Sequence, residues 1–479
     1  MVPILLIFIP VLTGLIAFFL KSGNSAKNWA LLSSVATLVI SLGSVCCVAN
    51  NQLSVNADWL PVMGAHFALS MDGMAKLLTL LTAVSFPIIF MATSKNEYKQ
   101  ANSFYALMLL AQAGLMGVFL ASDALLFYFF WELALIPVYF LCSIWGGEKR
   151  IQVTFKFFVY TFLGSLLMLI GILYLYFQTP DHSFAIKSFY ALKLSGKEQN
   201  LIFWLFFIAF AIKMPIFPFH TWQPDTYEQS PTAVTMVLSG IMVKMGIYAV
   251  IRWVLPIFPE AVETFRGLII ALSVIGMLYA SLIAIKQDDL KRLIAYSSIA
   301  HIGLMCAAIF SSKEVGLQGV ILQMFNHGIN VIGLWIVANV IEQQLGTRKF
   351  SELGGLAQKA PVLAILLVVL AFANVALPLT NAFIGEFLMF NGLFQFNIWW
   401  AAVAGISIIL SAVYTLNMVQ KVFYGNTVAA TVNAQDVGRN VQWVLAIVVL
   451  AIIVLGVYPQ PLINLSKDTV QAISVIYPK

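Results

Sequence analysis

The chain has 479 residues, of which 61% are hydrophobic and only 10% are charged, and its mean hydropathy is +0.93. Soluble domains carry about 25% charged residues, so the composition excludes an ordinary soluble protein. The formal net charge is +6, but the Lys and Arg residues are scattered singly and form no basic stripe with interleaved aromatic residues. We therefore expect no nucleic-acid partner.

Fourteen apolar segments follow one another along the chain, and each is long enough to cross a bilayer as a helix. The first lacks a basic leader and a clear cleavage site, so we interpret it as a retained helix and not as a signal peptide. The sequence thus predicts an all-α membrane protein with about 14 transmembrane helices, folded as a single transmembrane domain over residues 1–479 in contact with lipid. The segments lie near 2–20, 29–49, 73–94, 104–120, 122–145, 155–177, 201–222, 231–254, 264–285, 290–311, 317–341, 361–394, 398–424 and 440–459.

The loop charges predict the orientation of these helices. If the N-terminus faces outward, the inner loops hold 15 Lys and Arg residues and the outer loops hold 8, Lys479 among them, while the other three lie inside helices. Basic residues favour the inner side of a membrane. We therefore expect both termini on the outer side, which agrees with an even number of helices.

Two of the segments, the seventh and the twelfth, are interrupted by prolines. The first break is KMPIFPFH at 213–220, and the second is LPLTN at 377–381. Broken helices at corresponding positions indicate inverted repeats with a polar site at the breaks. This spacing predicts two five-helix repeats, at roughly 104–254 and 264–424, although ordinary proline kinks in membrane helices remain the alternative.

Five ionisable residues lie inside apolar segments, where each charge costs about 2.5–3.5 kcal/mol to insert. They are Glu132, Lys213, Lys244, His327 and Glu386. A lysine whose ammonium is buried and unpaired can release its proton at physiological pH. We therefore hypothesise a proton relay in which Glu132 modulates Lys213, which exchanges protons through water and His327 with Lys244 and Glu386; the alternative is a set of static buried ion pairs.

His301 lies mid-helix in AYSSIAHIGL and is a second-tier relay candidate, because a single histidine in a helix is more often a hydrogen-bonded packing residue. Other chemistry is missing from the sequence. The four cysteines have no CxxC spacing, and no GxGxxG, GxxxxGK[ST] or HExxH occurs. We therefore expect no metal and no cofactor on this chain.

Several stretches resemble the antiporter-like subunits of respiratory complex I, and they cover roughly residues 70–425 in order. They are DALLFYFFWELALIP from Asp123, KMPIFPFHTWQPDTYEQSPTAVTMVLSGIMVKMGIY from Lys213, DDLKRLIAYSSIAHIG from Asp288, FNHGINVIGLW from Phe325 and LPLTNAFIGEF from Leu377. The resemblance implies fourteen helices, two inverted five-helix repeats, and a proton channel with Glu132, Lys213, Lys244 and Glu386 on its axis.

The resemblance also implies a function and partners. The chain would be a proton-translocating subunit of NADH:quinone oxidoreductase in the respiratory chain, in a bacterial inner membrane. FMN, iron–sulfur clusters and quinone would belong to partner subunits, and the neighbouring antiporter-like subunits L and N would contact this chain.

Within the family, subunits L and N usually place Lys after the second break, whereas Glu386 in FIGEF follows the pattern of the subunit M branch. That branch commonly has Gly where Leu379 stands, and this departure can alter the geometry of the break. A multisubunit Na⁺/H⁺ antiporter or a membrane-bound hydrogenase is the nearest alternative function. A solitary solute transporter and a passive membrane scaffold are more distant alternatives.

Overall fold

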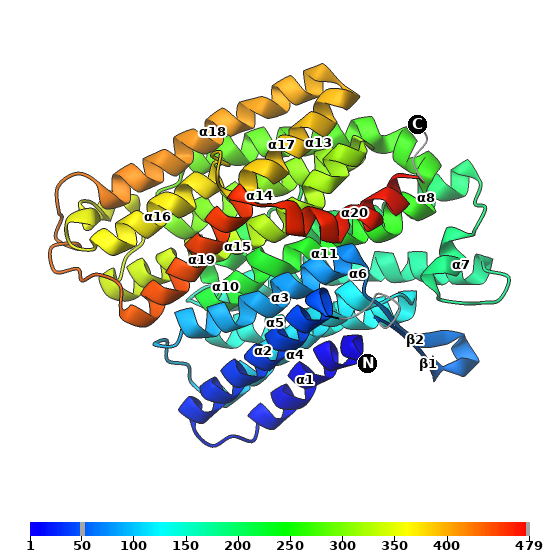
Figure 1. Cartoon of the computed structure of the whole chain (residues 1–479), viewed down its shortest axis with the longest axis horizontal. Coiled ribbons are helices and arrows are strands. Elements are labelled where there is room, and N and C mark those ends of the chain that lie inside the picture. Colours follow the sequence, from blue (N-terminus) through cyan, green and yellow to red (C-terminus); the bar gives the residue numbers. More distant parts are fainter. Residues whose placement is uncertain (48–52, 476–479) are drawn as a thin grey trace.

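The computed structural model describes residues 1–47 and 53–475, and these form an elongated bundle whose helices run roughly along its length (Figure 1). Lys479 and the last two residues of the predicted segment 29–49 lie outside the described residues. One end of the bundle, here named the hairpin end, carries strands β1 (Ser54–Leu60) and β2 (Ala65–Ser70). The opposite end is named the loop end. The start of α1 and the end of α20 both lie toward the hairpin end.

Within the described part of the chain, eleven helical segments are long and apolar enough to cross a membrane. The chain is therefore a multi-span membrane protein, as predicted. The eleven are α2 (Gly23–Cys46), α3 (Gly73–Ala92), α4 (Ala101–Leu120), α5 (Ala124–Trp145), α6 (Arg150–Gln178), the continuous run α10–α12 (Thr232–Ile257), α13 (Pro259–Lys286), α14 (Leu290–Phe310), α15 (Glu314–Leu345), α18 (Ile398–Phe423) and α19 (Arg439–Val457).

The other three predicted segments are shorter or interrupted helices. The first is α1 (Val2–Ala17), and the seventh is α8 (Gly196–Lys213), which stops at the first break. The twelfth is divided into α16 (Pro361–Asn374) and α17 (Asn381–Phe396). The helix number of fourteen and the two inverted repeats therefore stay predictions.

Some elements were not predicted. The antiparallel hairpin β1–β2 occupies the link between α2 and α3. The short helix α7 (Ile186–Tyr190) lies in the long polar loop before α8, and α9 (Gln223–Gln229) follows the first break. The last helix, α20 (Gln460–Ser474), packs against α3 and α15. These elements are too short or too polar to give the hydropathy signal that identified the spans.

Burial separates a protein-enclosed centre from a lipid-facing rim. The central stretches of α10–α12 and α15 are entirely buried, whereas only about a third of the residues in those of α2 and α19 are buried. The run α10–α12 includes two π-helical stretches, Leu238–Met242 and Val250–Val254, on either side of Lys244. Such local widening of a helix is frequent at functional sites.

A glycine lets the first break approach the centre. Gly246 lies in α11 (Val243–Ala249), and a Cβ added to it would meet Met214 N and Phe210 O at 2.7 Å. Because both of those atoms are backbone, no side-chain movement could relieve the clash. The C-terminal end of α8 can therefore pack directly on the helix that carries Lys244.

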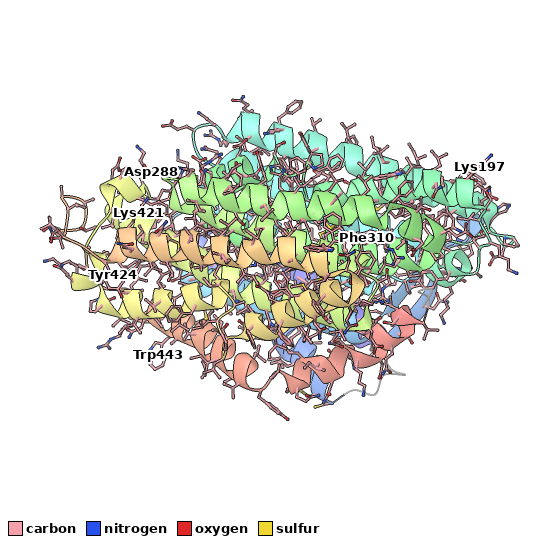
Figure 2. The ribbon with its side chains drawn as sticks, turned by 90° about the horizontal axis from the view of Figure 1, so that it is seen from above. Lys197, Asp288, Phe310, Lys421, Tyr424 and Trp443 are labelled. Carbon is pink, nitrogen blue, oxygen red and sulfur yellow. The ribbon has the colours of Figure 1, made fainter. Side chains whose placement is uncertain are left out.

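The predicted inner loops gather at one end of the molecule. Figure 2 places Asp288, Lys421 and Tyr424 at the loop end and Lys197 at the opposite end. At the loop end, Lys27 Nζ donates to the backbone oxygen of Ser94 at 3.1 Å.

Candidate functional site

Glu132 and Lys213 lie close together at the end of α8. Lys213 is buried, and its Nζ lies 5.5 Å from the ring centroid of Trp131, the residue before Glu132 on α5. Glu132 is near enough to act electrostatically on the Lys213 ammonium. Neither Lys213 Nζ nor Glu132 Oε1 has a hydrogen-bond partner among the described residues. The two groups thus form a separated charge pair.

Lys244 is completely buried and makes two polar contacts. Its Nζ donates to the backbone oxygen of Ser239 at 2.7 Å and lies 2.8 Å from His327 Nδ1. His327 comes from the middle of α15 and is also buried. At 2.8 Å one proton can be held by either nitrogen, which is the geometry that proton transfer between side chains requires.

His301 continues this contact toward the second break. Its ring centroid lies 5.5 Å from that of His327, and its Nδ1 lies 2.9 Å from Glu386 Oε1. Glu386 is on α17, five residues after that helix begins, and Gln323 Nε2 donates to the same carboxylate oxygen at 3.3 Å. The structure therefore brings Lys244, His327, His301 and Glu386 into one sequence of neighbours. His301, ranked second from the sequence, fills the position between His327 and Glu386.

Lys213 and Lys244 are less directly connected. The Lys213 ammonium makes no hydrogen bond with another described residue. Buried polar groups are nearly always hydrogen-bonded, and ordered water is the usual partner where protein atoms do not supply one. Several other buried polar atoms of the central helices also lack a hydrogen-bond partner among the described residues, including atoms of Gln112, Ser298, His301 and Asn330. These unpartnered atoms support hydration of the central region.

The second break is held by side chains of neighbouring helices. Asn374, the last residue of α16, donates to Ser297 Oγ at 3.2 Å and to Thr415 Oγ1 at 3.0 Å. Ser297 also lies 3.0 Å from the hydroxyl of Tyr414 on α18. Ser297 lies one helical turn before His301 on α14. The hydrogen bonds of this cluster therefore link the end of α16, at the second break, to the helix that carries His301.

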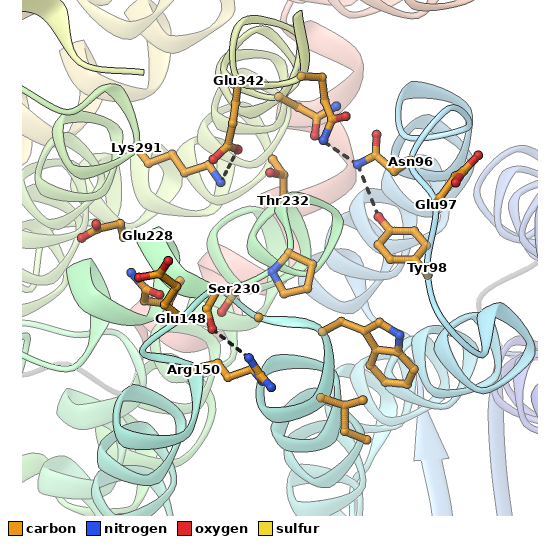
Figure 3. Close-up of a pocket in the computed structure, with 18 of the residues that line it drawn as sticks. Asn96, Glu97, Tyr98, Glu148, Arg150, Glu228, Ser230, Thr232, Lys291 and Glu342 are labelled. Atoms are coloured by element: carbon orange, nitrogen blue, oxygen red, sulfur yellow. Dashed lines mark hydrogen bonds and ion pairs between the residues drawn. The ribbon is translucent and has the colours of Figure 1, made fainter. Parts of the chain in front are cut away.

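A large polar cavity opens at the loop end (Figure 3). Its volume is about 1420 Å³, and charged residues from five separate parts of the chain line it, including Glu97, Arg150, Glu228 and Lys291. Its lining includes Thr232, the first residue of α10 (Thr232–Val237), and the nearby Ser230. The run α10–α12 that carries Lys244 therefore starts at the wall of this cavity.

Ion pairs border the cavity and join distant segments. Arg348 contacts Glu228 at 3.1 Å, Asp289 at 2.5 Å and Glu342 at 2.6 Å. Burial lowers the pKa of Arg348, but the hydrogen bonds and charges of Asp289 and Glu342 outweigh burial and hold that pKa above its ordinary value. Glu342 also pairs with the buried Lys291 at 2.6 Å.

Sequence reasoning missed this network. Each of its residues lies near a helix end or in a loop, where placing a charge costs little free energy. Neither this free-energy cost nor the spacing of the residues in the sequence distinguishes them from ordinary solvated charges. Only the three-dimensional arrangement brings segments more than 100 residues apart, such as Glu228 and Arg348, into contact.

Comparisons with known proteins agree with this architecture. Residues 121–411 match the family described as NADH:quinone oxidoreductase/Mrp antiporter, transmembrane. NADH-quinone oxidoreductase subunit M of Rhodobacter capsulatus is 36% identical over 463 residues, which cover 93% of this chain and 90% of that protein. The F(420)H(2) dehydrogenase subunit M of Methanosarcina mazei is 33% identical, with coverage of 98% and 97%. A chain of respiratory complex I from Thermus thermophilus superposes with a TM-score of 0.91 at 29% identity, and each chain is covered completely.

Proposed function

Because this chain belongs to the NADH:quinone oxidoreductase/Mrp antiporter family of transmembrane subunits, we propose that it is the M-type subunit of respiratory NADH:quinone oxidoreductase and moves protons through its buried Glu, Lys and His residues. Redox chemistry in other subunits drives the movement. FMN, iron–sulfur clusters and quinone belong to those subunits, and this chain carries no redox centre.

The observation that carries the proposal is the sequence of neighbours Lys244, His327, His301 and Glu386. It contains a 2.8 Å contact at one end and a 2.9 Å contact at the other. Each member has a side chain that can bind and release a proton, and histidine is a residue type that commonly serves as a proton shuttle. A static ion-pair set would not need two histidines between a lysine and a carboxylate.

The proposed cycle begins at the loop end. The cavity of about 1420 Å³ supplies protons toward Lys244, and the Glu132–Lys213 pair sets whether Lys244 holds its proton. When Lys213 is drawn toward Glu132, its positive charge moves away from Lys244 and the latter retains a proton more strongly. When Lys213 is released, repulsion favours transfer through His327 and His301 to Glu386.

The orientation and partners follow from charge and family. We place the loop end on the inner side of a bacterial inner membrane, because the predicted inner loops hold 15 basic residues against 8. Both termini then face the periplasm. The neighbouring antiporter-like subunits L and N are the proposed contacts within the membrane arm.

Antiport within a Na⁺/H⁺ antiporter complex is the second function of this family. The 36% identity to a subunit M over 93% of the chain and the acid after the second break both favour the complex I function. This chain is also similar to an F(420)H(2) dehydrogenase subunit M. The names of the two relatives differ in the electron donor of the complex, and the role that we propose for this chain does not depend on that donor.

Lys244→Met tests the proposal. Methionine is close in length to lysine but cannot carry a proton, so we expect NADH-driven proton uptake into inverted membrane vesicles to fall by about 100-fold or more. NADH oxidation should fall with it, because the two processes are coupled. Blue native electrophoresis checks that the complex assembles.

Lys197→Met is the matched control. Lys197 is exposed at the hairpin end, so this variant should pump at the wild-type rate. An assembled Lys244→Met complex that pumps normally would exclude Lys244 from the path, and Na⁺/H⁺ exchange would then be measured in the same vesicles.

A further inference from the structure

Two polar cavities open at the hairpin end, next to Arg252. One has a volume of about 590 Å³, and its lining includes Asp123 and Tyr248. The other has a volume of about 410 Å³ and lies beside α20, with Asp468 in its lining. Arg252 lines both cavities. Among the described residues, Arg252 is the one charged residue that the two linings share.

The Arg252 guanidinium is fixed in place by its neighbours. Its Nη2 lies 2.5 Å from Asp72 Oδ2, and its Cζ lies 5.4 Å from the ring centroid of Tyr248. The backbone oxygen of Arg252 accepts a hydrogen bond from the Tyr190 hydroxyl at 2.6 Å. Asp72 itself is held, since its Oδ1 accepts from the backbone N–H of Ala75 at the start of α3. The charge at this point is thus stationary.

The larger cavity extends close to Lys244. Tyr248, which lines that cavity, follows Lys244 by one helical turn, and Arg252 follows by two turns, about 12 Å along the axis. The Tyr248 hydroxyl donates to the backbone oxygen of Phe119 at 3.1 Å, which holds this side chain in place. Along this run Tyr248 therefore lies between Lys244 and the cavity, and Arg252 lines the same cavity one turn farther on.

In a pump, the protein between Lys244 and this cavity must not conduct protons freely. If Lys244 exchanged protons freely with the hairpin end while the loop-end cavity also reached it, protons would flow back through the chain. A fixed arginine at the entrance of such a path repels protons and other cations, and electrostatic barriers of this kind exclude them in membrane proteins.

We propose that Arg252 is an electrostatic seal that prevents proton leakage between Lys244 and the cavity of about 590 Å³ at the hairpin end. The proposal rests on the proposed function, because it assumes that Lys244 carries a proton. It assigns to Arg252 a role that is distinct from the relay: this side chain holds no transferred proton, and its positive charge keeps protons out.

A simple structural clamp between α3 and the run α10–α12 is the alternative for the Asp72–Arg252 pair. A clamp depends on the ion pair between Asp72 and Arg252, whereas a seal depends on the positive charge of Arg252. Asp72→Asn removes the ion pair but keeps the arginine charge, and asparagine can still cap α3. Asp72→Asn combined with Arg252→Gln removes that charge as well, and avoids leaving a partly buried carboxylate without a partner.

The experiment measures passive proton flux in liposomes that contain the complete complex, without NADH or quinone. The external pH is lowered in one step, valinomycin and K⁺ compensate the moving charge, and a trapped pH dye reports the interior. We expect the double variant to leak at least about fivefold faster than wild type, whereas Asp72→Asn and Arg252→Lys stay at the wild-type rate. Arg266→Gln, at the same end of the bundle, is the control for loss of an arginine.

The path of the leak is tested by adding Lys244→Met to the double variant, which should return the flux to the wild-type rate. A wild-type flux in the assembled double variant would overturn the proposal, and so would an equal leak in Asp72→Asn or a leak that persists without Lys244. These readouts are taken without turnover, so they stay distinct from the pumping assay that tests the function of Lys244.

Discussion

At the residue scale, the candidate site could be predicted from the sequence because burying a charge costs free energy. Glu132, Lys213, Lys244, His327 and Glu386 each lie inside an apolar segment, and four of the five are buried in the structure, with Glu132 half-buried. The spatial order of these five residues could not be predicted from the sequence. The free-energy cost of burying a charge identifies an unusual residue, but it does not identify the residues that contact it. The contact of His327 with Lys244 required the packing of α15 against the run α10–α12, and the intermediate position of His301 required the packing of α14 against α15.

His301→Gln tests that intermediate position. Glutamine can hydrogen-bond to Glu386 and fill most of the space, but it cannot take up and release a proton. We expect proton pumping by the assembled complex to fall by about 100-fold, with a change in thermal stability of only about 1 kcal/mol or less.

His66→Gln provides the comparison, since His66 lies in the hairpin, away from the relay, and pairs with the exposed Asp58. Proton pumping by that variant should match wild type. If His301→Gln also pumps at the wild-type rate, His301 is a packing residue and protons pass between His327 and Glu386 by another route.

At the scale of elements, prolines predicted both breaks, but the backbone shape of the second one has a further cause. Leu379 has φ 75° and Ala376 has φ 57°, both in the left-handed region that favours glycine. The resemblance to the subunit M branch implied a glycine at the position of Leu379, and the positive φ gives a physical reason for such a preference. Hydropathy and proline spacing carry no information about these angles, so the sequence predicted the location of the break and not its conformation.

Gly456→Ala should damage this break. A Cβ on Gly456 of α19 would meet Leu379 O at 2.2 Å and Thr380 C at 2.5 Å, so the two backbones would have to separate. We expect a loss of roughly 1–3 kcal/mol in stability, seen as a lower midpoint for heat-induced dissociation of the complex, together with slower pumping because α17 carries Glu386.

Gly405→Ala is the matched control, since a Cβ there meets nothing within 4 Å. It should leave both the dissociation midpoint and the pumping rate at wild-type values. Normal behaviour of Gly456→Ala would show that the break does not depend on close approach of α19.

At the scale of the whole molecule, ion pairs at the loop end connect the two predicted repeats. Glu228 follows the break in the first repeat, whereas Asp289 and Glu342 belong to helices of the second, and Arg348 contacts all three. The sequence predicted the helical membrane fold because hydropathy is a property of each segment. It could not predict this junction, which depends on how the segments are assembled.

Arg348→Leu should loosen the junction, because three carboxylates lose a common partner. We expect a decrease of about 1–3 kcal/mol in stability, measured as a lower midpoint for thermal dissociation of the complex. Lys349→Leu is the comparison, since the adjacent lysine is largely exposed and pairs with Glu352 at the surface. Equal midpoints for the two variants would mean that the network adds no stability beyond that of a surface pair.

The four residues of the proposed relay lie at similar depths in the bundle. Each lies 9 to 13 residues from the hairpin-end terminus of its own helix: 13 for Lys244, 13 for His327, 9 for His301 and 10 for Glu386. A proton passing along them therefore travels mainly parallel to the membrane plane and crosses little of the transmembrane voltage. Moving one charge across the whole membrane against 100 mV requires about 2.3 kcal/mol. That electrical work falls on the steps that bring the proton to Lys244 and release it from Glu386, so the lateral transfer between them should proceed at nearly the same rate in an energised and in a de-energised membrane.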